Sequence, residues 1–483
     1  MQKKLFNKII IESNKILNHD SSNATTASIS SLNINKFHPE YLKKATDVSI
    51  YVIFQNCFLQ LLHILQSLFY KKNILNKIKR KKVDILIISH LTNVNQLDNK
   101  SDPYFGSVEK LFEKNKFKTH KLLINHTTFN ENRLNQNLIK KNITILNKVL
   151  DIKTELTIFI NKISEFVRLL RNKIKEKDNF KKQILNRTML SLFGPETSFA
   201  MRLKIQIENS LSILNPSIMI STYEGYGWES ICFRAAKNYD YQIKCIGFQH
   251  TPIDQTISPF KKNNNFCNPD IIWCSDLQSL KLIKKYNKTF KKKIFHIGNL
   301  KENNKNKLSP KKNSLNTCLV LPEGIYNECI TLLKFSLKCL QLDNSINFIW
   351  RLHPIINVKK VLSLLDLKHK QLPKNIKIST EKNILFDSNK AKFVLYRGSA
   401  AVIQPSINGN IPIYLKDKNN INIDPLQKTL NNFNYVSSEK DFISKIKFYS
   451  KNNKNYKRKF VDKLLRNFNP KIKKNLIIKS LKN

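Results

Sequence analysis

The chain has 483 residues, of which 41% are hydrophobic, 10% aromatic and 25% charged, so it is long enough for two or three folded domains and too apolar for a disordered protein. Its 84 Lys and Arg against 35 Asp and Glu give a formal net charge of +49, which predicts attraction to nucleic acid, acidic lipid or a phosphorylated substrate. The lysines are spread along the whole chain, so an A/T-rich coding bias explains the charge equally well.

Glycine is scarce, with nine in the chain, where an average usage of about 7% predicts roughly thirty or more. Neither G-x-G-x-x-G nor G-x-x-x-x-G-K-[ST] occurs, which excludes a Gly-rich dinucleotide or P-loop phosphate cradle. The eight cysteines form no C-x-x-C pair, and several lie in apolar runs, so we expect buried thiols in a reducing compartment. The N-terminus lacks the apolar core of a signal peptide, and a cytoplasmic location is expected.

Residues 1–80 are expected to form a helical prefix. Within it, residues 48–70 carry no charge, are flanked on both sides by lysines, and are long enough to cross a bilayer. Their polar side chains nevertheless fall on one arc of a helix, so the segment is amphipathic. Three interpretations stay open: a helix packed on the protein, a helix on an anionic membrane surface at the inner face of the plasma membrane, and a true span.

From residue 83 onward, short apolar runs alternate with helical patterns, which is typical of βαβ units in a parallel sheet. The runs expected to be strands in the first half are 83–89, 121–124, 217–222, 243–248, 270–275 and 293–298, with charged helices between 142 and 177 and another over 196–214. The polar segment 301–314 indicates a domain boundary. Strands of the second half are expected at 317–323, 347–354, 376–380, 392–400 and 411–415.

The predicted fold class is therefore α/β, with two tandem doubly wound, Rossmann-like domains between a helical prefix and C-terminal helices. We expect an acceptor-side domain over 81–300, a donor nucleotide-binding domain over 315–430 and basic helices over 431–483. In doubly wound sheets the ligand binds at the carboxyl ends of the strands, so residues that directly follow strands are the candidates for a site.

The sequence TYEGYGWE follows the strand expected to end at Thr222. A carboxylate here, Glu224 first, could act as a general base towards a hydroxyl, and aromatic faces could hold a sugar ring. The acceptor-binding candidates are Tyr223, Tyr226, Trp228 and Glu229. The alternative is an acid at a helix N-terminus beside a packing Trp.

The next strand end carries His250, in the sequence GFQHTP. A loop His can serve as a base or as a donor to phosphate, although a lone loop His is most often ordinary surface. His90, at the end of the first expected strand, is a weaker candidate of the same kind.

In the second half, Arg351 and His353 lie two residues apart on one strand and so point to the same side. Two donors at a strand end suit a phosphate or diphosphate, and an Arg paired with a neighbouring element is the alternative. Glu323, at the end of an earlier strand, could contact a nucleotide.

A second phosphate site is expected where Arg397, Gly398 and Ser399 lead from a strand into a helix. The Ser hydroxyl and backbone amides there could bind an anion, and Gly398 would allow close approach. Pro405 should shorten this helix. No Ser-His-Asp series or set of metal-ligand spacings is present, so we expect neither a metal nor a cofactor.

These junctions resemble bacterial surface-polysaccharide transferases of the GT-B fold, over about residues 83–415. Bacterial sialyl- and polysialyltransferases carry acid-acid-Gly, His-Pro and Ser-Ser motifs. Here Glu224 and the Gly after it keep part of the first, His353 with the following Pro matches the second, and Ser399 keeps one Ser of the third. The chain is also similar to teichoic-acid glycerophosphotransferases, although QHTP lacks the Gly of their His-Gly-Thr-Pro, and to a group of surface carbohydrate biosynthesis proteins.

The resemblance implies a metal-independent transferase that moves a sugar or polyol phosphate from a nucleotide-activated donor to a saccharide or lipid-linked acceptor. Glu224 or His250 would deprotonate the acceptor, while His353 and Ser399, with Arg351, would stabilise the departing nucleotide phosphate, most simply cytidylate. CMP-, CDP- and UDP-linked donors stay open, as does the stereochemical outcome. The alternatives are a sugar-nucleotide epimerase, a non-catalytic relative of the fold, and a nucleic-acid-binding protein, for which no motif or Arg-rich arm is found.

Overall fold

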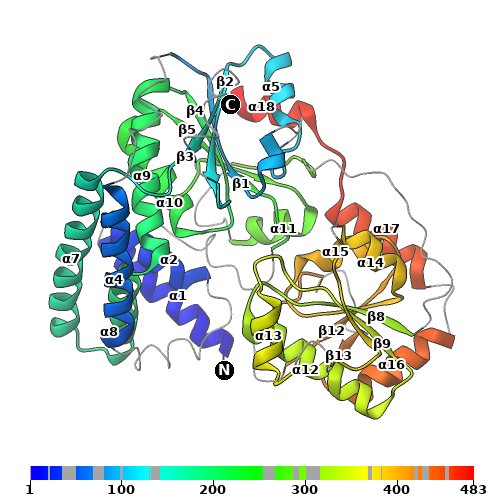
Figure 1. Ribbon diagram of the computed structural model, residues 1–483. Helices are drawn as coiled ribbons and strands as arrows, with labels where there is room; N and C mark the ends of the chain where they lie inside the picture. Colours follow the sequence, from blue (N-terminus) through cyan, green and yellow to red (C-terminus); the bar gives the residue numbers. More distant parts are fainter. Residues whose placement is uncertain are drawn as a thin grey trace.

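The computed structural model contains two parallel β-sheets, each with helices on both faces, and a separate group of helices beside the first sheet (Figure 1). The structure describes residues 2–19, 22–34, 50–68, 81–97, 102–129, 131, 142–253, 267–286, 293–300, 316–367, 372–381, 383–417, 422–426, 434–451 and 456–482. The predicted boundary segment 301–314 lies outside these residues.

The first sheet has seven parallel strands in the order β3-β2-β1-β4-β5-β6-β7. Its strands are β1 (Ile85–Leu91), β2 (Thr119–Asn125), β3 (Ile143–Leu146), β4 (Ile218–Thr222), β5 (Lys244–Gln249), β6 (Ile271–Cys274) and β7 (Lys293–His296). The helices around it are α5 (Val108–Lys114), α9 (Pro195–Leu214), α10 (Gly227–Tyr239) and α11 (Leu277–Tyr286), with a 3-10 turn η2 (Val94–Leu97). The strands are buried on both faces, which is why their sequences are continuously apolar rather than alternating.

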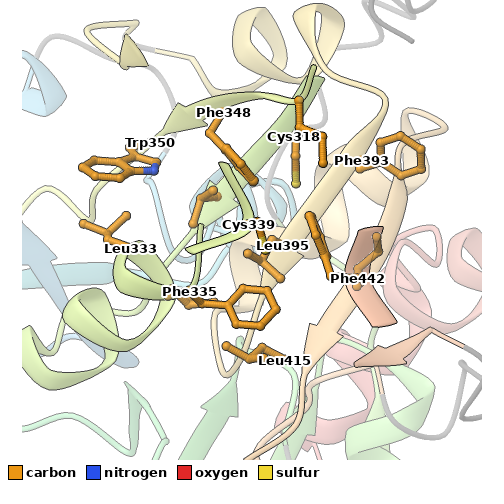
Figure 2. Packing of buried hydrophobic residues seen from close by; sticks show 14 of the residues in the cluster. Cys318, Leu333, Phe335, Cys339, Phe348, Trp350, Phe393, Leu395, Leu415 and Phe442 are labelled. Carbon is orange, nitrogen blue, oxygen red and sulfur yellow. The ribbon is translucent and has the colours of Figure 1, made fainter. Parts of the chain in front are cut away.

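The second sheet has six parallel strands in the order β10-β9-β8-β11-β12-β13. They are β8 (Thr317–Leu321), β9 (Asn347–Trp350), β10 (Ile376–Ile378), β11 (Phe393–Tyr396), β12 (Ile411–Leu415) and β13 (Tyr435–Val436). The helices are α12 (Tyr326–Leu342), α13 (Val358–Leu364), α14 (Ile384–Lys390), α15 (Ile403–Ile407) and α16 (Glu439–Lys451), with a 3-10 turn η8 (Ala400–Val402). Figure 2 shows one face of this sheet, where side chains of β8, β9 and β11 pack against those of α12 and α16.

The two-domain α/β fold is confirmed, and two details differ from the prediction. β3 lies where the charged helices were expected to begin, because its four residues form an edge strand too short to give a strong pattern. The second domain also continues beyond residue 430, since β13 extends its sheet and Phe442 and Ile446 of α16 complete its core.

The basic C-terminal segment closes the fold with the helices α17 (Tyr456–Phe468) and α18 (Lys474–Lys482). α17 contacts α15 of the second domain and α11 of the first, and the chain then returns to the first sheet (Figure 1). There the indole of Trp273 donates to the Ser480 hydroxyl at 2.9 Å, and Ile477 and Leu481 are buried in the core. The C-terminal helices are therefore structural parts of both domains.

Replacing Ile477 by Ala should lower the free energy of unfolding by about 2–4 kcal/mol, because it removes a fully buried side chain from the core of the first sheet. Urea denaturation followed by circular dichroism would measure the loss. Lys479→Ala, on the exposed side of the same helix, is the control. Equal stability of the two variants would show that α18 is not needed by the first domain.

A helical group stands at one side of the first domain and contains α1 (Gln2–His19), α2 (Asn23–Ile34), α4 (Ile50–Ser67), α7 (Ile152–Lys175) and α8 (Asn179–Leu192). α2 packs against α8, α9 and α10, which joins the group to the sheet, and α4 packs against α7. The helix expected in residues 48–70 is confirmed as α4, whereas its flanking lysines 43, 44, 71 and 72 lie outside the described residues. Over the described part of the chain, no helix is long and apolar enough to cross a membrane.

Candidate functional site

Both sheets reverse their chain order once, between β1 and β4 in the first and between β8 and β11 in the second. Such switch points leave a space at the carboxyl ends of the strands where doubly wound folds bind ligands. The candidate residues follow β4 and β5 in the first domain and β8, β9 and β11 in the second, so they divide into two groups at these two edges.

Glu229 organises the loop that follows β4. Its buried carboxylate accepts the backbone N–H groups of Glu224 at 2.9 Å, Gly225 at 2.6 Å and Tyr226 at 2.9 Å, as a first-turn acid of α10. Gly225 has a φ of +95°, which explains why this chain keeps a glycine there. Burial and the nearby Glu224 raise the pKa of Glu229 to about 8, against the effect of the amide donors. Glu229 was predicted to bind an acceptor, but the structure makes it the cap of this loop.

Glu224 and His250 come together from the ends of β4 and β5. His250 Nε2 lies 3.3 Å from Glu224 Oε1, and the Thr251 hydroxyl donates to the same oxygen. The side chain of Glu224 is 22% exposed and that of His250 only 8%. Glu224 is therefore the member of the pair that a substrate reaches more readily, and His250 stands behind it.

A second group of rings lies beside this pair and comes from β1, the loop after it, the end of β2 and the start of α10. The ring of Tyr104 meets His250 edge-on at 5.0 Å between centroids and lies 4.8 Å from His90, whose ring is 5.2 Å from Trp228. His90 Nδ1 is 2.9 Å from His126 Nε2. The sequence prediction did not select Tyr104 or His126, although His126 lies two residues after the strand expected at 121–124 and could have been found on that ground.

Hydrogen bonds connect the rings of this group to Thr222 and Glu229. With Glu229 ionised, the Thr222 hydroxyl donates to it at 3.3 Å and accepts from His90 Nε2, also at 3.3 Å. His90 Nδ1 is then an acceptor and receives the proton of His126 Nε2. Burial, with the neighbouring His126 and His250, lowers the pKa of His90 to about 3, so this His is neutral at physiological pH. Within the described residues, no three His, Cys, Asp or Glu side chains are arranged to hold a metal ion.

The neutral state of His90 predicts a pH dependence of stability. The folded pKa of His90 lies below the ordinary 6.5, so its contribution to the free energy of unfolding is complete above pH 6.5. This contribution is lost as the pH falls towards 3, because the unfolded chain binds a proton at this His and the folded chain does not. When the pH is lowered from 7 to 5, this effect decreases the free energy of unfolding of the unmodified protein. The decrease should be about 1–2 kcal/mol smaller in His90→Gln. Urea titrations at both values test this, with Lys479→Ala, an exposed substitution that removes no His, as control. An unchanged slope in His90→Gln would contradict the neutral assignment.

The aromatic acceptor candidates differ in position. Tyr223 is buried and its hydroxyl donates to Asn268 at 2.9 Å, so it belongs to the core and not, as predicted, to an acceptor surface. Tyr226 is exposed at the start of α10, and Trp228 is half-buried between the core and the ring of His90. Tyr226 and Trp228 are the two that can contact a ligand.

In the second domain, His353 and Ser399 lie at the ends of β9 and β11. His353 is exposed, and its Nδ1 lies 3.4 Å from the Ile355 amide, which favours a proton on Nε2. Ser399 precedes the short turn η8, and α15 with Pro405 follows at once, so the helix is short as expected. A Cβ at Gly398 would overlap the carboxyl of Glu323, which shows that this acid lies directly against the backbone at that position.

The two arginines are placed differently from the prediction. Arg351 Nη1 pairs with Asp387 at 2.7 Å and also donates to the Glu381 carbonyl at 2.9 Å. Arg397 is fully buried and pairs with Glu328 at 2.6 Å. Both charges are compensated by acids of their own domain, so the alternative of structural arginines holds and neither is placed as a phosphate ligand.

The carboxyl edges of the two sheets meet at one described contact. Gln278, at the start of α11 after β6, donates from Nε2 to the carbonyl of Pro425 at 2.7 Å. Pro425 lies in the segment between β12 and β13. Ile423 of the same segment lies next to Gly398, since a Cβ added at Gly398 would be 2.8 Å from Ile423 Cδ1. The segment between β12 and β13, which lies beside Gly398 and Ser399, therefore also contacts the first domain.

No protein-family model matches the sequence, and no curated protein matches it significantly. Among solved structures, the UDP-GlcNAc 2-epimerase of Methanocaldococcus jannaschii shares 14% identity at a TM-score of 0.46, over 83% of this chain and 99% of that one. The UDP-GlcNAc 2-epimerase of Neisseria meningitidis bound to UDP-GlcNAc shares 12% at 0.47, over 83% and 100%, and the glycotransferase of kitacinnamycin 10% at 0.44, over 80% and 94%. At these values the likeness says nothing of substrate or reaction, which rest on this chain's own residues.

Proposed function

We propose that the protein acts on a nucleotide-activated sugar and transfers the sugar, or a polyol phosphate, to a hydroxyl of a saccharide or lipid-linked acceptor. The observation that carries this is the Glu224–His250 pair, a carboxylate and an imidazole 3.3 Å apart at the ends of β4 and β5, beside the switch point of the first sheet. A base for the acceptor and donors for the leaving group are the two requirements of such a transfer, and the two sheet edges offer one each.

On the acceptor side, Glu224 takes the proton of the attacking hydroxyl. His250 is its positioning residue, because it is more deeply buried and holds the oxygen that Thr251 also contacts. The exposed ring of Tyr226 and the half-buried ring of Trp228 are the aromatic surfaces against which a sugar can stack. As the acceptor oxygen bonds to the transferred carbon or phosphorus, the bond to the donor breaks and the nucleotide leaves with its electron pair.

On the donor side, His353 and Ser399 supply hydrogen bonds to the departing phosphate, His353 from Nε2 and Ser399 from its hydroxyl. Glu323, against Gly398, is suited to accept from ribose hydroxyls rather than to face a phosphate. The likeness of the His-Pro and Gly-Ser sequences to transferases that use cytidylate-activated donors makes a cytidine nucleotide our first choice. We also propose that no metal is needed.

A second candidate function is the epimerisation of a nucleotide sugar, in which the nucleotide leaves and returns within one site. The hydrogen-bonded series His126–His90–Thr222 beside the Glu224–His250 pair favours it. Epimerisation needs a proton acceptor and a proton donor at the sugar, and this edge holds more acid–base groups than one transfer step requires.

A thermal-shift panel with CMP, CDP, UDP, GDP and ADP tests the shared core of both proposals, because a nucleotide that binds only the folded state raises Tm by mass action. We expect a cytidine nucleotide to raise Tm and the rise to shrink strongly in His353→Ala and in Ser399→Ala. Lys479→Ala, far from both edges, should respond like the unmodified protein. A panel without any shift would remove the donor site.

Chromatography of the products separates the two candidates. A nucleotide sugar converted to its epimer without an acceptor supports the second, whereas release of free nucleotide only when an acceptor is present supports the first. Binding without either product would make the chain a non-catalytic relative.

A further inference from the structure

The polar residues Gln60 and Ser67 of α4 face the protein interior, whereas Gln55 and Gln66 are exposed. Gln60 is buried, and its Oε1 accepts from Lys162 Nζ at 3.0 Å and from the Ser198 hydroxyl at 2.8 Å. The neighbouring Glu155 receives two hydrogen bonds from Arg202, at 2.6 and 2.8 Å. This buried network fixes which side of α4 faces inward, because turning the helix would leave Lys162 and Gln60 without partners in the interior.

The opposite side of α4 presents large apolar side chains to solvent. Phe54, Phe58, Leu61, Leu65 and Leu68 stand at spacings of four, three, four and three residues, and Leu62 lies beside them, so they form one stripe along the helix. Their exposed fractions run from 37% to 69%, and the residues are Phe54, Phe58, Leu61, Leu62, Leu65 and Leu68, with Leu59 at the margin. In α4 itself no residue is charged.

The neighbouring helix α7 repeats this feature. It contacts α4 and lies beside it at the outer left of Figure 1, away from the second domain. Its exposed apolar residues are 39–72% accessible and again share one helical face: Ile152, Leu156, Ile160, Ile163, Val167 and Ile174. Together the two stripes form one surface, which we call the α4–α7 face.

The exposed charges within α7 are basic, and its exposed acids lie at the helix ends, at Asp151 and beyond Lys175. Lys153, Arg171 and Lys175 of α7 are exposed, whereas its two acids, Glu155 and Glu165, are buried and paired with Arg202 and Arg168. An apolar surface with exposed basic side chains along the length of α7 complements an anionic bilayer.

We propose that the α4–α7 face docks the protein onto an anionic lipid bilayer, with both helices parallel to the surface and their apolar stripes in the headgroup–acyl boundary. Neither helix can span a membrane, so the contact is peripheral. At about 1.5 Å per residue, the 18 residues of α4 and the 24 of α7 would lay roughly 27 and 36 Å of helix on the bilayer. A second copy of the chain is the less suitable occupant, because a symmetric pairing would bring like charges together with no exposed acid of α7 to separate them.

Vesicle flotation with the full chain tests the proposal. We expect binding to vesicles of three parts phosphatidylcholine and one part phosphatidylglycerol, little binding to phosphatidylcholine alone, and a fall with added salt. Phe58→Glu with Leu65→Glu should lower the affinity about ten-fold or more, because two carboxylates enter the centre of the stripe. The matched control is Leu342→Glu with Phe448→Glu, which adds the same charge at side chains 56% and 57% exposed in the second domain.

Four outcomes would overturn the proposal. They are no binding of the unmodified protein to the anionic vesicles, equal binding to both lipid mixtures, equal losses in the two double variants, and a lipid-free dimer that only the α4 variant dissociates. The last would assign the face to a second copy. Melting curves of both double variants should match that of the unmodified protein, since all four side chains are exposed, and the nucleotide shift tests the donor site separately.

Discussion

Glu224→Gln should lower kcat for sugar transfer by about 10²- to 10⁴-fold and leave the donor KM nearly unchanged. The amide keeps the shape of the side chain and its contact with Thr251, but it cannot take a proton from the acceptor hydroxyl. Donor contacts are assigned to the second domain, so nucleotide binding should persist. Steady-state kinetics with the donor identified by thermal shift gives both parameters.

The matched control is Glu208→Gln, the same substitution at a Glu of α9 that pairs with Lys204 on the helix surface. It should keep the rate of the unmodified protein. If Glu224→Gln also keeps it, Glu224 is not the base, and His250→Asn becomes the deciding variant. If both Glu224→Gln and His250→Asn are active, the first-sheet edge is not the acceptor side.

Both sheets could be predicted because their strands are buried on two faces. Runs such as ILIIS in β1 and FVLY in β11 are apolar at every position, and their order along the chain with intervening helices leaves few alternatives to a parallel sheet. The same rule places functional residues at strand ends, which led to Glu224, His250, His353 and Ser399. β3 was missed because an edge strand of four residues gives too little pattern.

The roles of the charged residues required the tertiary structure. Arg351 finds its acid in Asp387, 36 residues along the chain, and Arg397 finds Glu328, 69 residues before it. A strand pattern shows on which side of the sheet an Arg points, but not whether an acidic side chain lies there to pair with it. The same holds for α4, since the sequence shows two faces, while the inward side is decided by Lys162, about a hundred residues away.

Glu229→Ala should lower the free energy of unfolding by about 3 kcal/mol or more. The change removes the acceptor of three backbone N–H groups, at residues 224, 225 and 226, and of the Thr222 hydroxyl, at a fully buried position. Each buried donor left without a partner costs about 1–3 kcal/mol, and a cavity replaces the side chain. Urea denaturation of the two proteins measures the difference.

The Gln variant separates capping from charge at the same position. Glu229→Gln keeps one carbonyl acceptor but brings an NH₂ group towards N–H donors, so its loss of stability should lie between zero and that of Glu229→Ala. The loop that Glu229 holds also carries Glu224, so activity should fall in the same order, Ala below Gln, with the pH profile of kcat unchanged in shape. A Glu229→Ala protein as stable as the unmodified one would show that the amides find other partners. A shifted pH profile would instead place Glu229 among the groups that exchange protons with the substrate.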